Sequence, residues 1–111
     1  KLQEVAAATM VGGATLTKLL GTSAWYAPGA AAGELVKSII TDGKKLIPCC
    51  VYLEGEYGED DLCIGVPVIL GADGVEKIVE LKLDGVEKDR FVESVAAARN
   101  TQNNLGDALK K

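Results

Sequence analysis

The 111-residue sequence contains no histidine. Histidine is the usual acid–base group near neutral pH and the commonest metal-binding side chain. A mechanism that relies on an imidazole base, or on zinc held by imidazoles, therefore cannot be completed by this chain alone. We expect the chain to contain neither a catalytic residue nor a metal site.

The sequence also lacks a long apolar run and an excess of basic residues. Its 12 Lys and Arg are outnumbered by 16 Asp and Glu, which gives a net charge of -4, whereas proteins that bind nucleic acid concentrate positive charge. No apolar stretch approaches the ~20 residues of a membrane-spanning helix. We expect no nucleic-acid partner and no membrane partner. Because no basic and apolar leader is evident, we also expect a cytoplasmic location.

Cysteine is scarce. The three cysteines are Cys49, Cys50 and Cys63. An odd number without CxxC spacing fits neither a disulfide framework nor a metal knuckle, so a reduced intracellular protein is the simpler interpretation. If Leu53 pairs with Leu62 across a turn, Cys63 faces Tyr52 and Cys50 lies diagonal to it, which leaves a redox pair open. Cysteine in an apolar strand more often acts as a small hydrophobe, and we favour that role.

The first part of the chain predicts two helices within a single compact domain. Residues 1–20 place apolar side chains at helical spacing, and Gly21 is a helix-stop signal. A second helix, rich in alanine and glycine, is expected to run to about Ile40 and to end at Asp42 and Gly43. The first helix has no capping residue ahead of Lys1, which suggests a chain cut from a longer protein.

The central part predicts an antiparallel meander of three strands, at residues 46–53, 62–70 and 75–83. Pro48 and Pro67 each remove a ladder donor, so they should lie where no neighbouring strand needs one. The first two strands are almost wholly apolar, whereas a half-exposed strand should alternate with polar residues. We infer that another domain or subunit packs on one face of the sheet.

The last predicted element is a helix from about Val86 to Ala98. Phe91 and Val95 lie on its apolar stripe, and the polar chain beyond Arg99 is expected to fray. With the two earlier helices and the three strands, this predicts an α+β fold in which an antiparallel sheet meander packs with long helices.

Two other groups of residues are candidate ligand sites. Residues 12–18 (GGATLTK) resemble a phosphate loop superficially, but the spacing differs and no strand precedes them. No GxGxxG turn follows a strand, so we expect no cofactor-binding residue. A group of carboxylates suggests either a calcium or magnesium site or a solvated hairpin tip, and the lack of EF-hand spacing favours the tip. These carboxylates are Glu54, Glu56, Glu59, Asp60 and Asp61.

The start of the second helix is the most informative stretch for function. Small polar residues, including Ser23, stand there beside Trp25 and Tyr26. A helix N-terminus can receive an anionic ligand through its free N–H groups and its dipole. The alternative is an ordinary helix cap with two core aromatics, and local chemistry alone favours that alternative.

Several segments resemble, in order along nearly the whole chain, the lactate/malate dehydrogenase family. Residues 21–31 (GTSAWYAPGAA) and 47–58 (IPCCVYLEGEYG) are similar to two of its motifs. Residues 66–71 (VPVILG) and 74–78 (GVEKI) match two more, and 11–14 (VGGA) fits the family's preceding helix. The resemblance is specific because the matching segments follow one another in the same order as in the family. No single segment would be specific by itself.

The resemblance implies that residues 1–111 are the substrate-binding C-terminal domain of an NAD-dependent malate dehydrogenase, which converts malate and NAD to oxaloacetate and NADH. In the family, NAD is bound by an N-terminal Rossmann domain, and the catalytic His and Asp lie upstream of this segment. By position, Ser23 and Ala24 would form a wall of the pocket for a small dicarboxylic 2-hydroxy or 2-oxo acid. The resemblance also implies a homo-oligomer, a dimer or tetramer.

We therefore expect residues 1–111 to be a domain that has no dehydrogenase activity by itself. Ala24 favours malate over lactate as the substrate of the parent enzyme, but the loop that discriminates between the two lies outside this chain. Two alternatives remain: a lactate-type 2-hydroxy acid dehydrogenase, and a stand-alone protein-interaction module that uses the apolar sheet face and the small-residue helix.

Overall fold

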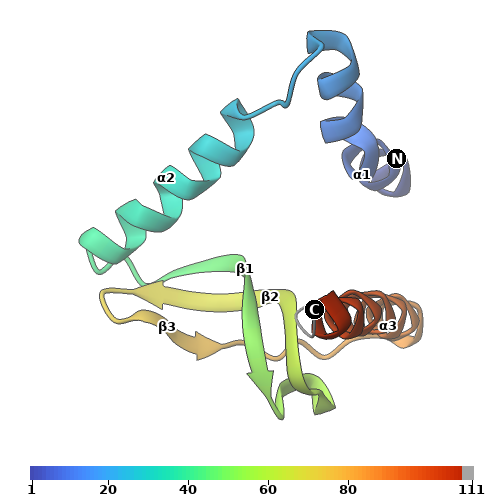
Figure 1. Cartoon of the computed structure of the whole chain (residues 1–111). Coiled ribbons are helices and arrows are strands. Elements are labelled where there is room, and N and C mark those ends of the chain that lie inside the picture. Colours follow the sequence, from blue (N-terminus) through green and yellow to red (C-terminus); the bar gives the residue numbers. More distant parts are fainter. Residues whose placement is uncertain (109–111) are drawn as a thin grey trace. The chain divides into compact units, whose positions relative to one another are not determined.

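The computed structural model describes residues 1–108, and side chains as far as Leu105. It contains three α-helices and a three-stranded antiparallel sheet, and a short 3-10 helix, Glu56–Gly58, lies between the first two strands (Figure 1). The α+β prediction is confirmed. The chain divides into two compact units, Lys1–Lys37 and Ser38–Lys111.

The first unit consists of α1 (Leu2–Leu20) and most of α2 (Tyr26–Ile40). Gly21 ends α1 in the left-handed conformation, with φ 67°, which glycine adopts without the Cβ penalty of other residues. None of the residues of α1, all of which the structure describes, is buried. The apolar side chains of α1 therefore have no core of their own within this unit.

The sheet belongs to the second unit. Its strands β1 (Lys45–Glu54), β2 (Asp60–Gly71) and β3 (Gly74–Ile78) are in sequence order, with β2 at the centre. Leu53 pairs with Leu62 as predicted. Pro48 lies directly opposite Pro67, and the Pro67 carbonyl accepts a hydrogen bond from Val79 N–H on the β3 side, 2.8 Å away.

This pairing shows how the two prolines are accommodated between β1 and β2. A strand residue directs its N–H and C=O toward the same neighbour, so the missing N–H of Pro67 would also point toward β3 and away from β1. Pro48 and Pro67 therefore form a non-hydrogen-bonded pair, and neither removes a bond between β1 and β2. Pro48 lies on an edge strand, where proline is tolerated.

The third strand is shorter than predicted. Residues 79–83 are not in a strand, because the tip of the β1–β2 hairpin binds them instead. The Tyr57 hydroxyl donates to the Val79 carbonyl at 2.7 Å and accepts from Leu81 N–H at 3.0 Å. Glu80 accepts a bond from Tyr57 N–H at 2.8 Å. The two bonds to the Tyr57 hydroxyl satisfy backbone groups that would otherwise pair with a neighbouring strand. The alternation of apolar residues in this segment does not indicate that these bonds exist.

The last helix, α3 (Gly85–Ala108), is longer than predicted. Asp84 and Glu87 exchange hydrogen bonds at its start, each between one residue's carboxylate and the other's N–H, as in a capping box. Beyond Arg99 the helix continues, so the expected fraying is wrong. Arg99 binds Glu59 at 2.6 Å, and Gln102 binds the Asp61 carbonyl at 3.0 Å, which anchors the polar end of α3 to the hairpin.

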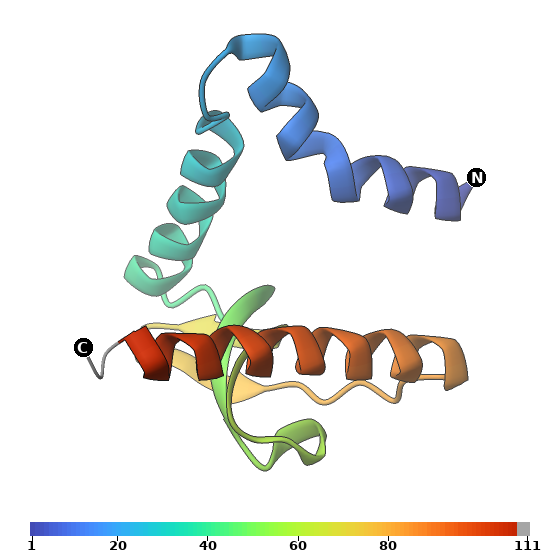
Figure 2. The ribbon, with the colours of Figure 1, turned by 45° about the vertical axis from the view of Figure 1, so that its right-hand side comes forward.

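One face of the sheet packs against α3, which crosses it in Figure 2. The core consists of one residue of β1, four alternate residues of β2 and one residue of α3, namely Leu53, Leu62, Ile64, Val66, Val68 and Val95. Phe91 and Ala98 pack beside this core, whereas Val86 at the start of α3 is exposed.

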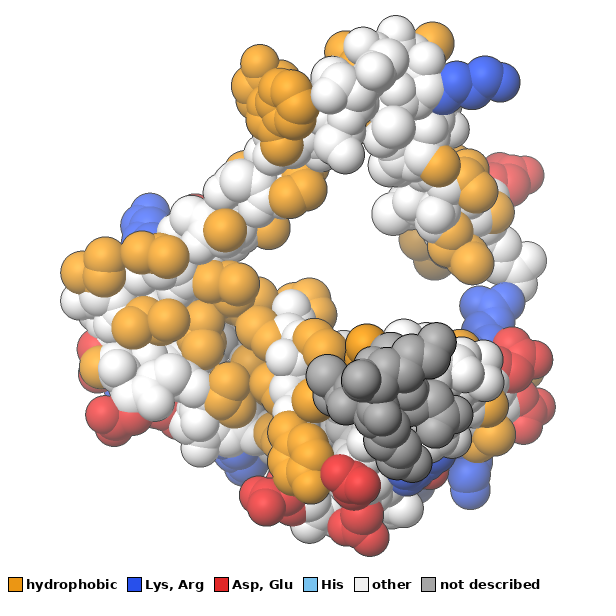
Figure 3. Space-filling view, in the orientation of Figure 1, with side chains coloured by type: hydrophobic (Ala, Val, Ile, Leu, Met, Phe, Trp, Pro, Cys, Tyr) orange, Lys and Arg blue, Asp and Glu red, His pale blue; other side chains and the backbone are white. Residues whose placement is uncertain are grey.

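The opposite face of β1 and β2 is apolar yet exposed. Apolar side chains gather over these strands in the space-filling view (Figure 3). Leu46 remains 59% exposed and Tyr52 50% exposed, although both strands are almost wholly apolar in sequence. A contiguous exposed apolar face commonly marks an interaction surface. The packing of another domain or subunit on this face stays a prediction.

Candidate functional site

The predicted pocket-wall residues lie on the link between α1 and α2. Ser23 is exposed and Ala24 half-buried, and both precede the first turn of α2. The Trp25 carbonyl accepts a hydrogen bond from Gly29 N–H at 2.8 Å, which places Trp25 at the helix start. Pro28 lies in the first turn, where its missing N–H removes no helical bond.

The first turn of α2 leaves backbone donors for an anion. Tyr26 and Ala27 carry N–H groups in the part of the helix where no preceding carbonyl is available. The aligned peptide dipoles add partial positive charge at the same end. A carboxylate can be held by such donors. This arrangement can bind and orient an anion.

Two aromatic side chains flank this position. The rings of Trp25 and Tyr26 have centroids 6.2 Å apart and are tilted by 40°, a separation within the favourable range for aromatic pairs. Both are exposed, Trp25 by 56%, so they are not the core aromatics of the alternative interpretation.

The site contains no acid–base group suited to neutral pH. The sequence has no histidine, and Tyr26 is the only titratable side chain among residues 22–27. Proton transfer at this position would need a group from outside the segment. The local residues can therefore contribute binding and orientation.

The carboxylates at the hairpin tip are engaged in holding the tip together. Glu56 accepts a hydrogen bond from Glu54 N–H at 2.8 Å, and this bond lowers the pKa of its carboxyl. Glu59 pairs with Arg99. Asp61 accepts a bond from the Tyr52 hydroxyl at 3.2 Å, which raises the pKa of that phenol. In the described part of the chain, no group of three or more metal-ligating side chains is found. These bonds support the hairpin-tip interpretation.

The cysteines occupy the positions expected from the strand register. Tyr52 pairs with Cys63 and Cys50 pairs with Gly65, which puts Cys50 diagonal to Cys63 on the exposed face. All three cysteines are free thiols, and Cys49 is half-buried on the core side. The small-hydrophobe interpretation suits Cys49, whereas Cys50 and Cys63 are exposed.

Sequence reasoning missed two surface hollows in the second unit. One, of about 340 Å³, lies between the hairpin tip and the start of α3, and Tyr57, Glu80 and Phe91 contribute to its wall. The other, of about 390 Å³, is largely apolar and lies between Tyr52 and Cys63 on one side and the end of α3 on the other. The flanking Gly55 and Gly58 hinted at a special turn around Tyr57, whose φ is 57°, but not at the residues it binds.

The structure thus defines an α+β fold in which the start of α2 has backbone N–H donors of the kind that suit an anion. Residues 1–107 match the family described as lactate/malate dehydrogenase, alpha/beta C-terminal domain. The chain belongs to this family, as the sequence resemblance predicted.

Among curated relatives, the chain is similar to malate dehydrogenase of Bacteroides thetaiotaomicron, with 71% identity over 101 residues, 91% of this chain and 32% of the relative. It is 60% identical to malate dehydrogenase of Flavobacterium frigidimaris over 109 residues, 98% of this chain and 34% of the relative. The chain therefore spans about a third of the length of these relatives.

Solved structures agree with this assignment. Malate dehydrogenase from Salinibacter ruber matches with a TM-score of 0.93 and 44% identity, over 97% of this chain and 35% of that one. Lactate dehydrogenase from Eimeria maxima, solved with NADH and oxamate, matches with a TM-score of 0.90 and 32% identity, over 96% of this chain and 34% of that one. Among residues 1–108, no helix is long and apolar enough to cross a membrane.

Proposed function

We propose that the chain is the C-terminal substrate-binding and oligomerisation domain of an NAD-dependent malate dehydrogenase. The observation that carries this proposal is 71% identity to a malate dehydrogenase across nearly the whole chain, together with coverage of only a third of that relative. The remaining two thirds of such a protein would supply the NAD-binding domain and the catalytic His and Asp.

Ser23 and Ala24 would form part of the substrate pocket. The donors at the start of α2 suit a carboxylate of a small dicarboxylic acid, and the small side chain of Ala24 leaves room for it. The contribution of this chain would be to orient the substrate and to exclude water from one side. Orientation of this kind lowers the barrier to a reaction whose chemistry other groups supply.

NAD does not fit the residues described here. Its hydride chemistry belongs to the cofactor, and its usual cradle is a Gly-rich turn between a parallel strand and a helix. The described strands pair only in antiparallel fashion. NAD binding is therefore assigned to the part of the longer relatives that lies outside the region matched by this chain.

Exposed apolar surfaces support an oligomer of such an enzyme. The apolar residues of α1 and the outer face of β1 and β2 are left uncovered by their own units. These surfaces would meet the NAD-binding domain and further copies of the protein. All three cysteines are free thiols. Because thiols stay reduced in the cytoplasm, a cytoplasmic location is proposed.

A lactate-type parent is the second candidate. Its support is the similarity to the Eimeria maxima lactate dehydrogenase, at 32% identity. Malate is favoured because the relatives that share 60–71% identity with the chain are named malate dehydrogenases. The stand-alone interaction module remains a third candidate, supported only by the exposed apolar face.

The proposal is tested by comparing two purified proteins, the 111-residue chain and the full-length product of the gene that encodes it. NADH oxidation with oxaloacetate is expected from the longer protein alone. Turnover by the short chain would show that catalysis does not need residues outside it. A gene that encodes only these residues would favour the interaction module.

A further inference from the structure

We propose that Asp73 is a site of spontaneous backbone modification, at which the aspartate converts to isoaspartate, and that the fold protects Asp42 and Asp84 from the same reaction. Each of these three residues is followed by glycine. Asp42 lies between α2 and β1, Asp73 in the turn between β2 and β3, and Asp84 directly before α3. This reactivity does not depend on the proposed dehydrogenase activity.

The reaction joins the main-chain nitrogen of the glycine to the side-chain Cγ of the aspartate before it. The nitrogen attacks the protonated carboxyl, one molecule of water leaves, and a succinimide ring forms. Water then reopens the ring: addition at Cγ restores aspartate, whereas addition at the main-chain carbonyl carbon leaves the chain running through Cγ, as isoaspartate. The water that was lost is regained, so the product is an isomer of the starting protein and no oxidant is needed. Glycine favours ring closure because it has no Cβ and a permissive backbone.

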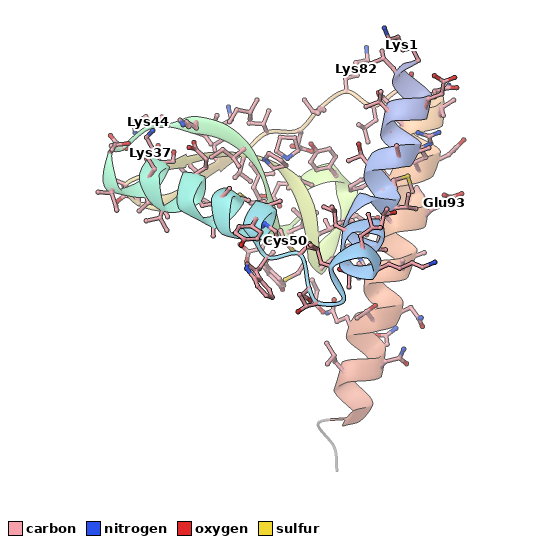
Figure 4. The ribbon with its side chains drawn as sticks, turned by 90° about the horizontal axis from the view of Figure 1, so that it is seen from above. Lys1, Lys37, Lys44, Cys50, Lys82 and Glu93 are labelled. Atoms are coloured by element: carbon pink, nitrogen blue, oxygen red, sulfur yellow. The ribbon has the colours of Figure 1, made fainter. Side chains whose placement is uncertain are left out.

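Asp42 has both reacting groups held by hydrogen bonds. The Ala72 N–H donates to its carboxylate at 3.0 Å. The Lys44 ammonium, which Figure 4 labels at the turn between α2 and β1, lies 3.5 Å from the same oxygen. The Gly43 N–H donates to the Ser38 carbonyl at 2.7 Å. Attack of the Gly43 nitrogen on Asp42 would therefore require bonds to break on both sides.

Asp84 is held as the capping residue of α3. Its carboxylate accepts a hydrogen bond from the Glu87 N–H at 2.8 Å, and its own N–H donates to the Glu87 carboxylate at 3.1 Å. Its main-chain carbonyl accepts a bond from the Lys88 N–H at 2.8 Å. The carboxyl can turn toward the Gly85 nitrogen only if this cap opens, and opening the cap destabilises the start of the helix.

Asp73 lacks such restraints. It is exposed in the β2–β3 turn, and among the residues that the structure describes its carboxylate has no hydrogen bond or ion pair. Gly74 has a φ of 86°, and a Cβ placed there would meet no heavy atom within 4 Å in the described part of the chain, which leaves space for the ring. Gly74 and Gly71 are the last pair between β2 and β3. Attack needs this terminal pair to open, but no contact of the Asp73 carboxylate has to break.

Conversion would alter a turn that holds neighbouring groups in place. Isoaspartate adds one carbon to the main chain of the turn formed by Ala72 and Asp73, and the length of a hairpin loop selects its turn type. The Ala72 N–H binds Asp42, and Glu76 on β3 binds Lys44 at 2.8 Å. Modification at Asp73 would therefore weaken the attachment of the loop between α2 and β1.

The test is to incubate the folded full-length protein at neutral pH and physiological temperature, and to quantify isoaspartate at each of the three residues over time. Electron-transfer mass spectrometry of the peptides distinguishes the two linkages by their fragments. Isoaspartate is expected to accumulate at Asp73 at least about tenfold faster than at Asp42 or Asp84. This factor corresponds to about 1.4 kcal/mol, close to the contribution of one hydrogen bond.

The control is the same protein unfolded in urea, where the native hydrogen bonds are absent and the three residues should react at similar rates. A variant tests one protecting bond directly. Ala72→Pro removes the N–H that holds Asp42 and suits the turn, because proline is favoured at the second of the four residues of a turn. It should speed conversion at Asp42 about 2–10-fold, the effect of one hydrogen bond, and leave the rate at Asp84 unchanged.

Conversion at Asp42 or Asp84 as fast as at Asp73 in the folded protein would overturn the proposal. So would the absence of isoaspartate at Asp73 after the unfolded sample has converted. An equally large preference for Asp73 in urea, or an unchanged rate at Asp42 in Ala72→Pro, would show that the native hydrogen bonds do not protect the other residues. Each readout is independent of dehydrogenase activity.

Discussion

Ser38 donates a hydrogen bond from its hydroxyl to the carbonyl of Leu70, across 2.7 Å and 32 positions of sequence. Ser38 lies near the end of α2 and is fully buried, while Leu70 lies near the end of β2. Gly43 lies close by, and a Cβ at that position would meet the Ser38 hydroxyl at 3.1 Å. This bond fixes the last turn of α2 on the sheet.

Replacement of Ser38 by alanine removes this bond and leaves the Leu70 carbonyl without that donor. Loss of a buried hydrogen-bonding partner costs about 1–3 kcal/mol, so the free energy of unfolding should fall by that amount in urea denaturation. Ser94→Ala is the matched control, because the Ser94 hydroxyl is exposed and bonds only within α3, to the Arg90 carbonyl. A Ser38→Ala variant as stable as the control would contradict this role.

Tyr57→Phe tests why β3 stops at Ile78. The variant keeps the ring contact with Phe91, whose centroid is 5.1 Å away, but loses the hydroxyl that binds Val79 and Leu81. With each bond contributing about 1 kcal/mol, the free energy of unfolding should drop by about 1–2 kcal/mol. Exchange of the Leu81 amide hydrogen should also become faster.

The control for this variant is Tyr26→Phe, which removes a hydroxyl from an exposed ring. Unchanged exchange at Leu81 in Tyr57→Phe would mean that the segment after β3 is held by something else. A similar loss of stability in Tyr26→Phe would show that the effect is not specific to the hairpin tip.

Asp42 should make the free energy of unfolding depend on pH in the acidic range. The Ala72 N–H donates to its carboxylate at 3.0 Å, which, with Lys44 nearby, lowers the pKa of this carboxyl in the folded state. A depressed folded pKa contributes stability that is present above the unfolded pKa and lost as pH falls through the folded value. The contribution of Asp42 should therefore disappear in acid, below about pH 4.

Asp42→Asn isolates this effect, because asparagine tolerates the positive φ of 47° at this position and can still accept the bond. The difference in unfolding free energy between wild type and variant should shrink as pH falls from about 7 to about 2. Asp89→Asn removes the same charge from exposed α3 and controls for net charge. A wild type–Asp42→Asn difference that is constant over this range would contradict the assignment.

Lys44 should affect the pH dependence of stability in the opposite direction, at high pH. Its ammonium binds Glu76 at 2.8 Å, which raises the pKa of Lys44 in the folded state. Stability from a raised pKa is complete below the unfolded value and is lost as pH rises through the folded one. Lys44→Met should therefore cancel part of the loss of stability seen in wild type as pH rises past about 10. An unchanged alkaline profile in that variant would exclude this pair as a source of stability.

Ala24 is expected to limit the size of the substrate pocket. In the full-length protein, Ala24→Leu should lower kcat/KM for oxaloacetate about 10–100-fold, because the added carbons occupy space that a carboxylate needs. Ala32→Leu, an exposed position further along α2, is the matched control. Equal kcat/KM in the two variants would remove Ala24 from the pocket wall.

The register of the sheet could be predicted because one pairing determines all the others. Once Leu53 is placed opposite Leu62, the positions of Cys63 and Cys50 follow from the two-residue period of strands. The ends of α1 and α2 also followed from local signals, Gly21 above all. Local sequence signals were sufficient to predict the register of the sheet and the ends of these helices.

The errors occurred where contacts between distant residues decide the structure. Residues 79–83 alternate like a strand, yet Tyr57 binds their backbone. The polar end of α3 remains helical because Arg99 and Gln102 reach the hairpin tip 39–41 positions away. The role of Ser23 and Ala24 came from the family resemblance, because a helix start and two aromatics do not by themselves identify a substrate.

The substrate preference of the full-length protein decides whether this domain serves a malate dehydrogenase. The most direct test is to measure kcat/KM of the full-length protein for oxaloacetate and for pyruvate, with NADH in excess. Oxaloacetate is expected to be preferred by at least about a hundredfold, a difference that a pocket matched to a second carboxylate can supply. Preference for pyruvate would identify a lactate-type enzyme, and turnover of neither acid would contradict the proposed function.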